Sequence, residues 1–336
     1  MTDFDYQKQA QDYYAKAPVI ILGSGASMAF GLPGMGELAE HIKTHVDTSA
    51  IPCSETGSWS EFCSLLETGT DLEAALHQVN FSNDTTDLII QSVWDLINSR
   101  DESVYQSSID DRHLFSLGTM LSHMFKSSLS ELNIVTTNYD CLAEYACDQE
   151  GLHHYSGFSH GYTRRLAAPG YISCSRKVNI WKVHGSLDWF YSTQNETISI
   201  PKSQFRPDDY RPQIVTPGVQ KYQKTHLEPY RSIIGSADTV LSNASAYLCV
   251  GFGFNDEHIQ PKLLQKCQRD GAAIVIVTYA LTDQAKALIF DGNIKNYLAI
   301  ERADDGRSRI YSSQLEDPII VEGDFWSLQG FLNLIM

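Results

Sequence analysis

The sequence predicts an α/β fold: a mostly parallel sheet with helices on both faces, together with a helical insertion. Three observations support this. Short apolar runs rich in β-branched residues alternate with segments of helical periodicity at both ends of the chain. A long stretch in the first half has helical periodicity and no strand signal. Glycine or polar residues directly follow several predicted strands, so the architecture that we expect is Rossmann-like.

Size and composition are those of a globular chain. Of the 336 residues, 43% are hydrophobic and 20% are charged, which is enough apolar material for a substantial core. We expect residues 1–336 to form a single domain and residues 48–130 to form a helical insertion within it. This insertion either packs beside the sheet or caps the site.

Charge and composition exclude several classes of protein. The formal net charge of −16 opposes direct nucleic-acid binding, which needs clustered Lys and Arg side chains. No apolar run approaches the roughly 18 residues of a membrane span, and the first residues are too polar for a secretory signal. The seven cysteines form no C-x-x-C pair, which opposes a zinc ribbon and a disulfide framework. We therefore expect a cytoplasmic protein with reduced thiols and no metal.

The elements up to the end of the insertion are predicted from their apolar spacing. A helix is expected at Tyr6–Tyr14, a buried strand at Pro18–Leu22 and a second helix at Met35–Val46. The insertion should hold four helices joined by polar connections that include 98–108: Trp59–Glu67, Leu72–Val79, Asp84–Ile97 and Arg112–Phe125.

The second half returns to alternating strands and helices. Strands are expected at Leu132–Thr137, Val178–Val183, Ala246–Val250, Ala273–Thr278, Tyr297–Ile300 and Ile319–Val321. Helices are expected at Cys141–Gln149, Ser236–Asn243, from Asp256 to about Arg269, from Thr282 onward, and at Phe325–Ile335. An irregular stretch precedes Val178. A small excursion should place strands at Leu187–Ser192 and Ile214–Thr216, with a loop at Pro201–Pro217.

The first strand runs into a glycine turn and a helix start. Gly23, Ser24 and Gly25 form the turn, and Ala26 and Ser27 open the helix. Glycines allow close backbone approach, while the N–H groups and dipole of a helix start favour an anion such as a nucleotide pyrophosphate. The spacing departs from G-x-G-x-x-G, so an ordinary strand-to-helix turn is the alternative.

Four predicted strands end in clusters of glycine or polar residues, at 23–27, 136–140, 184–186 and 251–256. In an open parallel sheet, ligands bind beyond the carboxyl ends of the strands, where the strand order reverses. The four clusters are therefore expected to meet at one crevice.

These clusters carry a family resemblance. GSGAS at 23–27, GLP at 31–33, TTNYD at 136–140 and HGS at 184–186 resemble the ordered NAD-site motifs of sirtuin-like proteins. GFGFND at 251–256, with the sequence around TTNYD and HGSLDW, resembles the bacterial sirtuin-like (SIR2-like) NAD hydrolases of antiphage defence. The resemblance implies an NAD glycohydrolase that cleaves NAD, its substrate, to nicotinamide and ADP-ribose.

The chemistry of two side chains agrees with this implication. Asn138 has an amide that can fix a ribose hydroxyl or a water, and His184 can act as a general base near neutral pH. These two residues are the expected catalytic pair. The expected NAD-binding residues are Gly23, Ser24, Gly25, Ala26, Ser27, Pro33, Thr137, Asp140, Gly251, Phe254 and Asp256. By resemblance, Asp140 accepts from the nicotinamide amide, residues 24–27 hold the pyrophosphate, and the last three residues border the adenosine half.

Structural interpretations of the same residues stay open. His184 can be a hydrogen-bonded structural residue, and Asn138 or Asp140 can be the N-cap of the helix that follows. His153, His154 and His160 have no Cys or carboxylate frame that would favour a metal site.

The chain also departs from the deacylase pattern. Gly34, Met35 and Gly36 follow GLP where deacylases continue differently, Thr137 replaces a glutamine, and the zinc ribbon has no counterpart. These departures disfavour a protein deacylase. A regulatory subunit that binds NAD or ADP-ribose without turnover is the other alternative.

The resemblance further implies the setting in which the chain works. It suggests depletion of NAD during infection, assembly into a homo-oligomer, and a HerA-type hexameric ATPase as a partner subunit.

Overall fold

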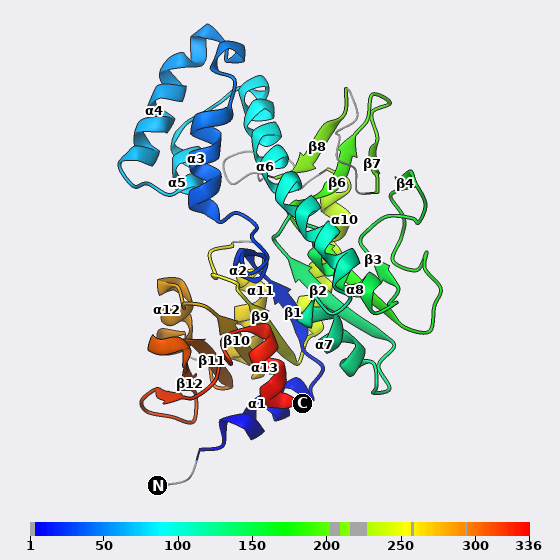
Figure 1. Cartoon of the computed structure of the whole chain (residues 1–336), viewed down its shortest axis with the longest axis vertical. Coiled ribbons are helices and arrows are strands. Elements are labelled where there is room, and N and C mark those ends of the chain that lie inside the picture. Colours follow the sequence, from blue (N-terminus) through cyan, green and yellow to red (C-terminus); the bar gives the residue numbers. More distant parts are fainter. Residues whose placement is uncertain (1–3, 202–208, 216–226, 257–258, 293) are drawn as a thin grey trace.

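Nine strands form the main sheet of the computed structural model, which describes residues 4–201, 209–215, 227–256, 259–292 and 294–336. Their spatial order is β13-β12-β11-β10-β9-β1-β2-β5-β3 (Figure 1). The strands from β11 to β3 run parallel to one another. The β12 strand is antiparallel to both of its neighbours, β11 and β13. Their bounds are β1 Val19–Leu22, β2 Glu131–Thr136, β3 His154–Tyr155, β5 Lys177–Lys182, β9 Ala246–Val250, β10 Ala273–Thr278, β11 Tyr297–Arg302, β12 Ser308–Ser312 and β13 Ile319–Val321.

The strand order reverses at the first strand. From β1 the chain adds β2 and β5 on one side, then returns to add β9, β10 and β11 on the other. Leu22 at the end of β1 pairs with Val250 at the end of β9, so the two carboxyl ends are level. The reversal therefore creates a crevice beyond these two strands.

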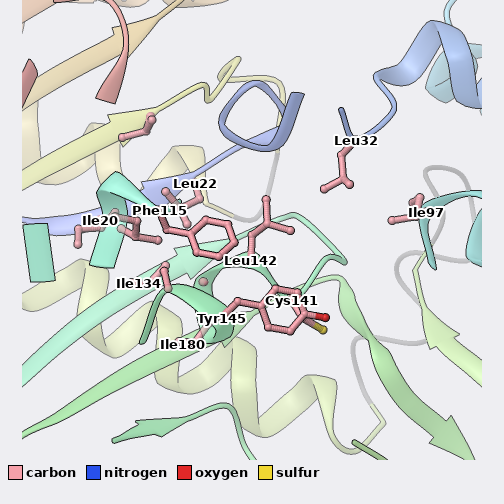
Figure 2. Packing of buried hydrophobic residues seen from close by; sticks show 14 of the residues in the cluster. Ile20, Leu22, Leu32, Ile97, Phe115, Ile134, Cys141, Leu142, Tyr145 and Ile180 are labelled. Atoms are coloured by element: carbon pink, nitrogen blue, oxygen red, sulfur yellow. The ribbon is translucent and has the colours of Figure 1, made fainter. Parts of the chain in front are cut away.

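The central strands are buried on both faces, which explains their continuous apolar sequence. Ile20 and Leu22 of β1 face one core, whereas Val19 and Ile21 face the other. The same alternation continues in the neighbouring strands. Figure 2 shows the first core, where strand residues such as Ile134 meet Phe115 and Leu142 from the helices that cover this face.

Helices cover both faces of the sheet (Figure 1). One face packs against α1 Tyr6–Tyr14, α7 Ser116–Met124, α8 Leu142–Gln149 and α13 Leu328–Ile335. The other packs against α10 Tyr230–Asn243, α11 Gln260–Gln265, η3 Lys266–Asp270 and α12 Asp283–Asp291. Two short helices, α2 Ser24–Met28 and η4 Asp304–Gly306, follow β1 and β11. The predicted fold class, a mostly parallel sheet with helices on both faces, is confirmed.

Between β1 and β2 the described chain contains helices and no strand. After α2, these helices are α3 Met35–His45, η1 Thr48–Ala50, η2 Cys53–Glu55, α4 Thr56–Glu67, α5 Leu72–Gln78 and α6 Asn83–Asp110, followed by α7. Figure 1 shows α3, α4, α5 and the start of α6 gathered beyond one edge of the sheet, while the rest of α6 descends toward α8. We call the group α3–α5 the helical lobe.

The polar connection predicted at 98–108 is wrong, because α6 continues through it to Asp110. Its buried face passes through Ile97, Asp101, Val104 and Ser108, at the spacing of one helix face. Two of these four residues are polar, which hides the pattern. Asp101 is fully buried and accepts hydrogen bonds from the Cys141 N–H (2.8 Å) and the Tyr145 hydroxyl (2.6 Å) of the α8 region.

A second, antiparallel sheet has the order β4-β7-β6-β8. Its strands are β4 Arg164–Arg165, β6 Gly185–Tyr191, β7 Thr197–Ser199 and β8 Arg211–Ile214. The sequence predicts neither β3 nor β4 nor β7, because two or three residues are too few to give a pattern. It also misses β12, whose buried positions include Ser308 and Ser312. Most of the predicted loop 201–217, and Thr216 of a predicted strand, lie outside the described residues.

Other boundaries differ by a few residues. The α10 helix begins at Tyr230 rather than Ser236, because Tyr230 and Ile233 extend its buried face. Thr282 is the N-cap of α12, as predicted, and its hydroxyl accepts the Ala285 N–H at 3.1 Å.

Replacing Asp101 with Ala is expected to destabilise the protein. The change leaves the Tyr145 hydroxyl and the Cys141 N–H buried without their acceptor, which costs about 2–4 kcal/mol of unfolding free energy. Urea unfolding measures this loss. Glu102→Ala on the same helix, where the carboxylate bonds to Gln106, is the control and should change the free energy by less than about 1 kcal/mol. Equal losses in both variants would contradict the assignment.

Candidate active site

The four polar segments lie at the ends of four adjacent strands, β9, β1, β2 and β5. Register pairs join Leu22 to Thr136 and Thr136 to Lys182, so the segments leave the sheet at one edge. They surround a cavity of about 210 Å³. It is lined by Gly23, Ser24, Ser27, Leu32, Pro33, Met35, Leu38, Glu73, Ile97, Thr137, Asn138, Tyr139, Asp140, His184, Val215, Phe252, Gly253, Asn255 and Asp256.

The glycines of two loops allow the backbones after β1 and β9 to touch. The Gly25 N–H donates to the Gly251 carbonyl at 3.0 Å. Gly251 has φ +57°, and a Cβ built there would lie 2.2 Å from the Ala26 nitrogen. A Cβ on Gly23 would lie 2.4 Å from the Gly251 carbonyl oxygen. These glycines therefore permit close approach, and one N–H of the expected anion site is already used within the protein.

A short chain of hydrogen bonds orients Asn138. Its amide nitrogen donates to the Gly23 carbonyl and to Ser27 Oγ, both at 2.9 Å. The Ser27 hydroxyl in turn donates to Asp140 Oδ2 at 2.7 Å. Because a backbone carbonyl only accepts, the atom facing Gly23 must be the NH₂ group. With both N–H bonds used, the amide oxygen is the group that Asn138 offers to a ligand.

Asp140 is buried and has a structural role. Its Oδ1 accepts the Leu142 N–H, the first of α8, at 3.2 Å. The N-cap of α8 is Cys141, so the interpretation of Asn138 or Asp140 as the N-cap is wrong. The backbone carbonyl of Asp140 accepts from Lys182. Burial, followed by the nearby Asp101 carboxylate, raises the pKa of Asp140 to about 6, although Lys182 and the Ser27 hydroxyl act in the opposite direction.

His184 lines the cavity two residues beyond β5 and is nearly buried. Its carbonyl accepts the Val215 N–H at 2.8 Å, which ties it to the segment after β8. Its Nε2 lies 3.0 Å from Asp256 Oδ2. Gly185, the next residue, has φ +91°, and a Cβ there would lie 2.1 Å from the Gln213 carbonyl oxygen. Only glycine fits this turn.

The structure brings most of the predicted site residues together. Nine of them line the cavity: Gly23, Ser24, Ser27, Pro33, Thr137, Asn138, Asp140, His184 and Asp256. Four others, Gly25, Ala26, Gly251 and Phe254, do not line it. Phe254 is fully buried and packs against Phe252 with ring centroids 4.9 Å apart.

Several lining residues are not predicted from the sequence. Tyr139 lies inside the TTNYD motif, and its hydroxyl donates to the Val215 carbonyl at 2.7 Å. Burial, then the charges of Glu73 and Asp256, raises the pKa of Tyr139, and both carboxylate residues line the same cavity. Glu73 of α5 is one of the unpredicted residues. Four others form an apolar wall that consists of Leu32, of Met35 and Leu38 from α3, and of Ile97 from α6. In Figure 2, Leu32 and Ile97 lie away from the strand residues, toward the helical lobe.

The described part of the chain shows neither a membrane-spanning helix nor a cluster of metal ligands. None of its helices combines the length and apolar character that a membrane span requires. No group of three or more His, Cys, Asp and Glu side chains among these residues is arranged to hold a metal ion.

Gly251→Ala is expected to destabilise the protein strongly. Alanine would be strained by the left-handed backbone of this position, and its Cβ would clash with the Ala26 nitrogen. We therefore expect a loss of more than about 3 kcal/mol in unfolding free energy. Gly306→Ala is the control for strain alone, since Gly306 has φ +80° and no atom within 4 Å of an added Cβ, and it should cost about 1–2 kcal/mol. Denaturant unfolding compares the two, and similar losses would refute the close approach.

Asp140→Asn is expected to change the pH dependence of stability. The folded pKa of about 6 exceeds the ordinary value of 3.8. The stability contributed by the protonated carboxyl is therefore fully present below about pH 4 and is lost as the pH rises through about 6. The unfolding free energy of the wild type, relative to the variant, should fall by about 3 kcal/mol between about pH 4 and pH 7. Urea unfolding across this range tests it; a difference independent of pH would exclude the raised pKa.

Comparisons with known proteins bear on this site. A family model described as a SIR2-like domain matches residues 132–299. No curated protein matches the chain. Solved structures with a similar fold include a Sir2 homologue in complex with NAD, at 15% identity and TM-score 0.45, covering 88% of each chain. Another Sir2 homologue, bound to 2′-O-acetyl ADP-ribose, has 15% identity and TM-score 0.45 and covers 88% of this chain and 90% of that one. Sir2Tm bound to a propionylated peptide has 13% identity and TM-score 0.43, covering 86% and 100%.

The residues matched by the family model include most of the polar segments that line the cavity. Residues 132–299 are half of the chain and include β2, β5, β9 and β10. They also hold three of the four polar segments, with Asn138, His184 and Asp256. The chain belongs to the family of SIR2-like domains.

Proposed function

We propose that the chain is an NAD glycohydrolase, which cleaves the nicotinamide–ribose bond of NAD to give nicotinamide and ADP-ribose. The observation that carries the proposal is that Asn138 and His184 line one cavity with the glycine turn, in a member of the SIR2-like family. An amide oxygen and an imidazole that line the same cavity provide an acceptor for a hydroxyl and a base for a proton.

The reaction needs few groups from the protein. The bond between C1′ of the ribose and the pyridinium nitrogen breaks, and its electron pair stays with nicotinamide, which leaves as a neutral molecule. Water attacks C1′, and His184 accepts the proton that is released, either from the water or through a ribose hydroxyl. Asn138 orients the hydroxyl or the water through its amide oxygen. The proton then passes to solvent, so that NAD⁺ and water give nicotinamide, ADP-ribose and one proton.

The charges of the cavity support placing the nicotinamide–ribose end there. Glu73, Asp140 and Asp256 contribute carboxyl groups, and the described lining residues include no Lys or Arg. The pyridinium ring of NAD is cationic, whereas its pyrophosphate is anionic. The cavity therefore suits the end of the dinucleotide where the bond breaks, and Ser24 at its edge is placed toward the pyrophosphate in this proposal.

We also propose that residues 48–130 are an insertion that closes one side of the site, in a single domain of residues 1–336. Glu73 and Ile97 from this segment line the cavity, which supports the proposal. A cap formed by the insertion would limit the access of bulk water to the site and would separate released nicotinamide from the reacting ribose.

The biological setting belongs to the same proposal. The motifs resemble those of antiphage effectors, so the activity would deplete NAD in the cytoplasm when infection is sensed. An enzyme that destroys NAD must be held inactive otherwise. The proposed control is assembly, as a homo-oligomer or with a HerA-type ATPase partner.

Asn138→Ala and His184→Ala are each expected to lower NAD turnover by at least about 10²-fold, because they remove the acceptor and the base. The measurement is nucleotide analysis of NAD incubated with the protein, alone and with the product of its neighbouring gene. Asn138→Ala should lose about 1–2 kcal/mol of unfolding free energy with its two hydrogen bonds. His184→Ala should lose about 1–3 kcal/mol, because it removes the imidazole beside the buried Asp256 carboxylate.

Asn243→Ala and His113→Ala are the matched controls, because both side chains are exposed and distant from the cavity. They should keep full turnover. Wild-type turnover in both site variants would refute the proposal. Binding of NAD without nicotinamide release under every condition would indicate a regulatory subunit, and release that requires an acyl-lysine peptide would indicate a deacylase.

A further inference from the structure

His184 and Asp256 form a buried pair that spans the crevice. Nε2 of His184 lies 3.0 Å from Oδ2 of Asp256, and their side chains are 11% and 8% exposed. His184 follows β5 and Asp256 follows β9, with β1 and β2 lying between these strands in the sheet. The pair therefore depends on the fold and not on proximity in the sequence.

Asp256 is held in place by its own loop. Its Oδ1 accepts the Ile259 N–H at 3.0 Å, and its carbonyl accepts the Gln260 N–H at 3.1 Å, at the start of α11. Earlier in the loop, the Thr282 hydroxyl donates to the Gly253 carbonyl at 2.6 Å, and Phe254 is fully buried. One carboxylate oxygen thus anchors the residue while the other faces His184.

We infer that Asp256 is the positioning residue of His184, which holds the imidazole ring and determines which of its nitrogens carries the proton. This inference rests on the proposed function, and it gives Asp256 a different place from the adenosine half expected from the resemblance. Nε2 is the ring nitrogen that lies 3.0 Å from the carboxylate, although this contact lacks the alignment of a hydrogen bond. The negative charge beside it favours the neutral imidazole that carries its proton on Nε2. Nδ1 is then the atom that accepts a proton from water or a ribose hydroxyl.

The carboxylate also acts during the reaction. When His184 accepts a proton it becomes a cation in a buried site, and a carboxylate 3.0 Å away stabilises that cation. Asp256 itself lines the cavity, so its charge also faces the space where the reaction would occur. The effect should appear in the chemical step and not in NAD binding, because Asp256 acts through His184.

Asp256→Asn separates positioning from helix capping, since Asn keeps an oxygen for the Ile259 N–H and loses the charge. We expect kcat for NAD to fall about 10–100-fold, KM to stay within about twofold, and thermal unfolding to change little. Asp256→Glu should recover part of the lost kcat. Asp283→Asn is the matched control, because it removes an exposed aspartate from the first turn of α12, and it should leave kcat unchanged.

Wild-type kcat in Asp256→Asn would overturn the inference. A rise in KM at constant kcat would also overturn it, because that pattern belongs to a group that binds NAD directly. A loss of folding in Asp256→Asn would assign the residue to structure alone.

A second measurement does not depend on turnover. Nitrogen NMR of the protein labelled at histidine, with the His184 signals identified by their absence in His184→Ala, reports which ring nitrogen is protonated. We expect the Nε2–H form in the wild type and its partial loss in Asp256→Asn. An Nδ1–H form in the wild type would refute the positioning role. If the wild type releases no nicotinamide but shows the Nε2–H form that Asp256→Asn loses, the proposed function fails and the positioning contact stands.

Discussion

The contact between two backbone loops at the centre of the sheet is the constraint on which the site depends. The Gly25 N–H donates to the Gly251 carbonyl, and the Gly251 N–H donates to the Val277 carbonyl at 2.9 Å, so the ends of β1, β9 and β10 are tied together. No side chain fits between these loops. From this junction one loop presents Ser27 to Asn138 and the other carries Asp256 to His184. Backbone geometry thus sets the positions of both proposed catalytic side chains.

A buried lysine supports the loop of Asn138 from beneath. Lys182 on β5 is 1% exposed, donates to the Asp140 carbonyl, and lies 3.2 Å from a Glu144 carboxylate oxygen. Burial alone would lower the pKa of Lys182, but the surrounding carboxylates, Glu144 foremost, raise it above its ordinary value, so the amine stays charged. Removing one member of such a pair leaves an uncompensated charge inside the protein. The loop is therefore supported by an ion pair in the core as well as by apolar packing.

The sequence predicts the sheet well and the site in part, for physical reasons. Central strands such as Ala246–Val250 and Ala273–Thr278 are found at their predicted bounds, because burial on both faces makes them continuously apolar. The second half of α6 is missed because its buried face uses Asp101 and Ser108. Motifs indicate Asn138 and His184, since both follow strands directly. No local pattern reveals that Glu73 lines the same cavity, or that Asp256 meets His184, because both depend on how distant elements pack.

The α6 helix has a mechanical consequence. It is one continuous rod from Asn83 to Asp110. Near its middle Ile97 lines the cavity, and one turn later Asp101 holds the backbone of Cys141, the residue next to Asp140. The helical lobe, whose α3 packs against α6, is thus linked through one helix to the segment that carries Asn138. Under the proposed function, a partner that binds the lobe would act on the proposed catalytic amide of Asn138 through this helix.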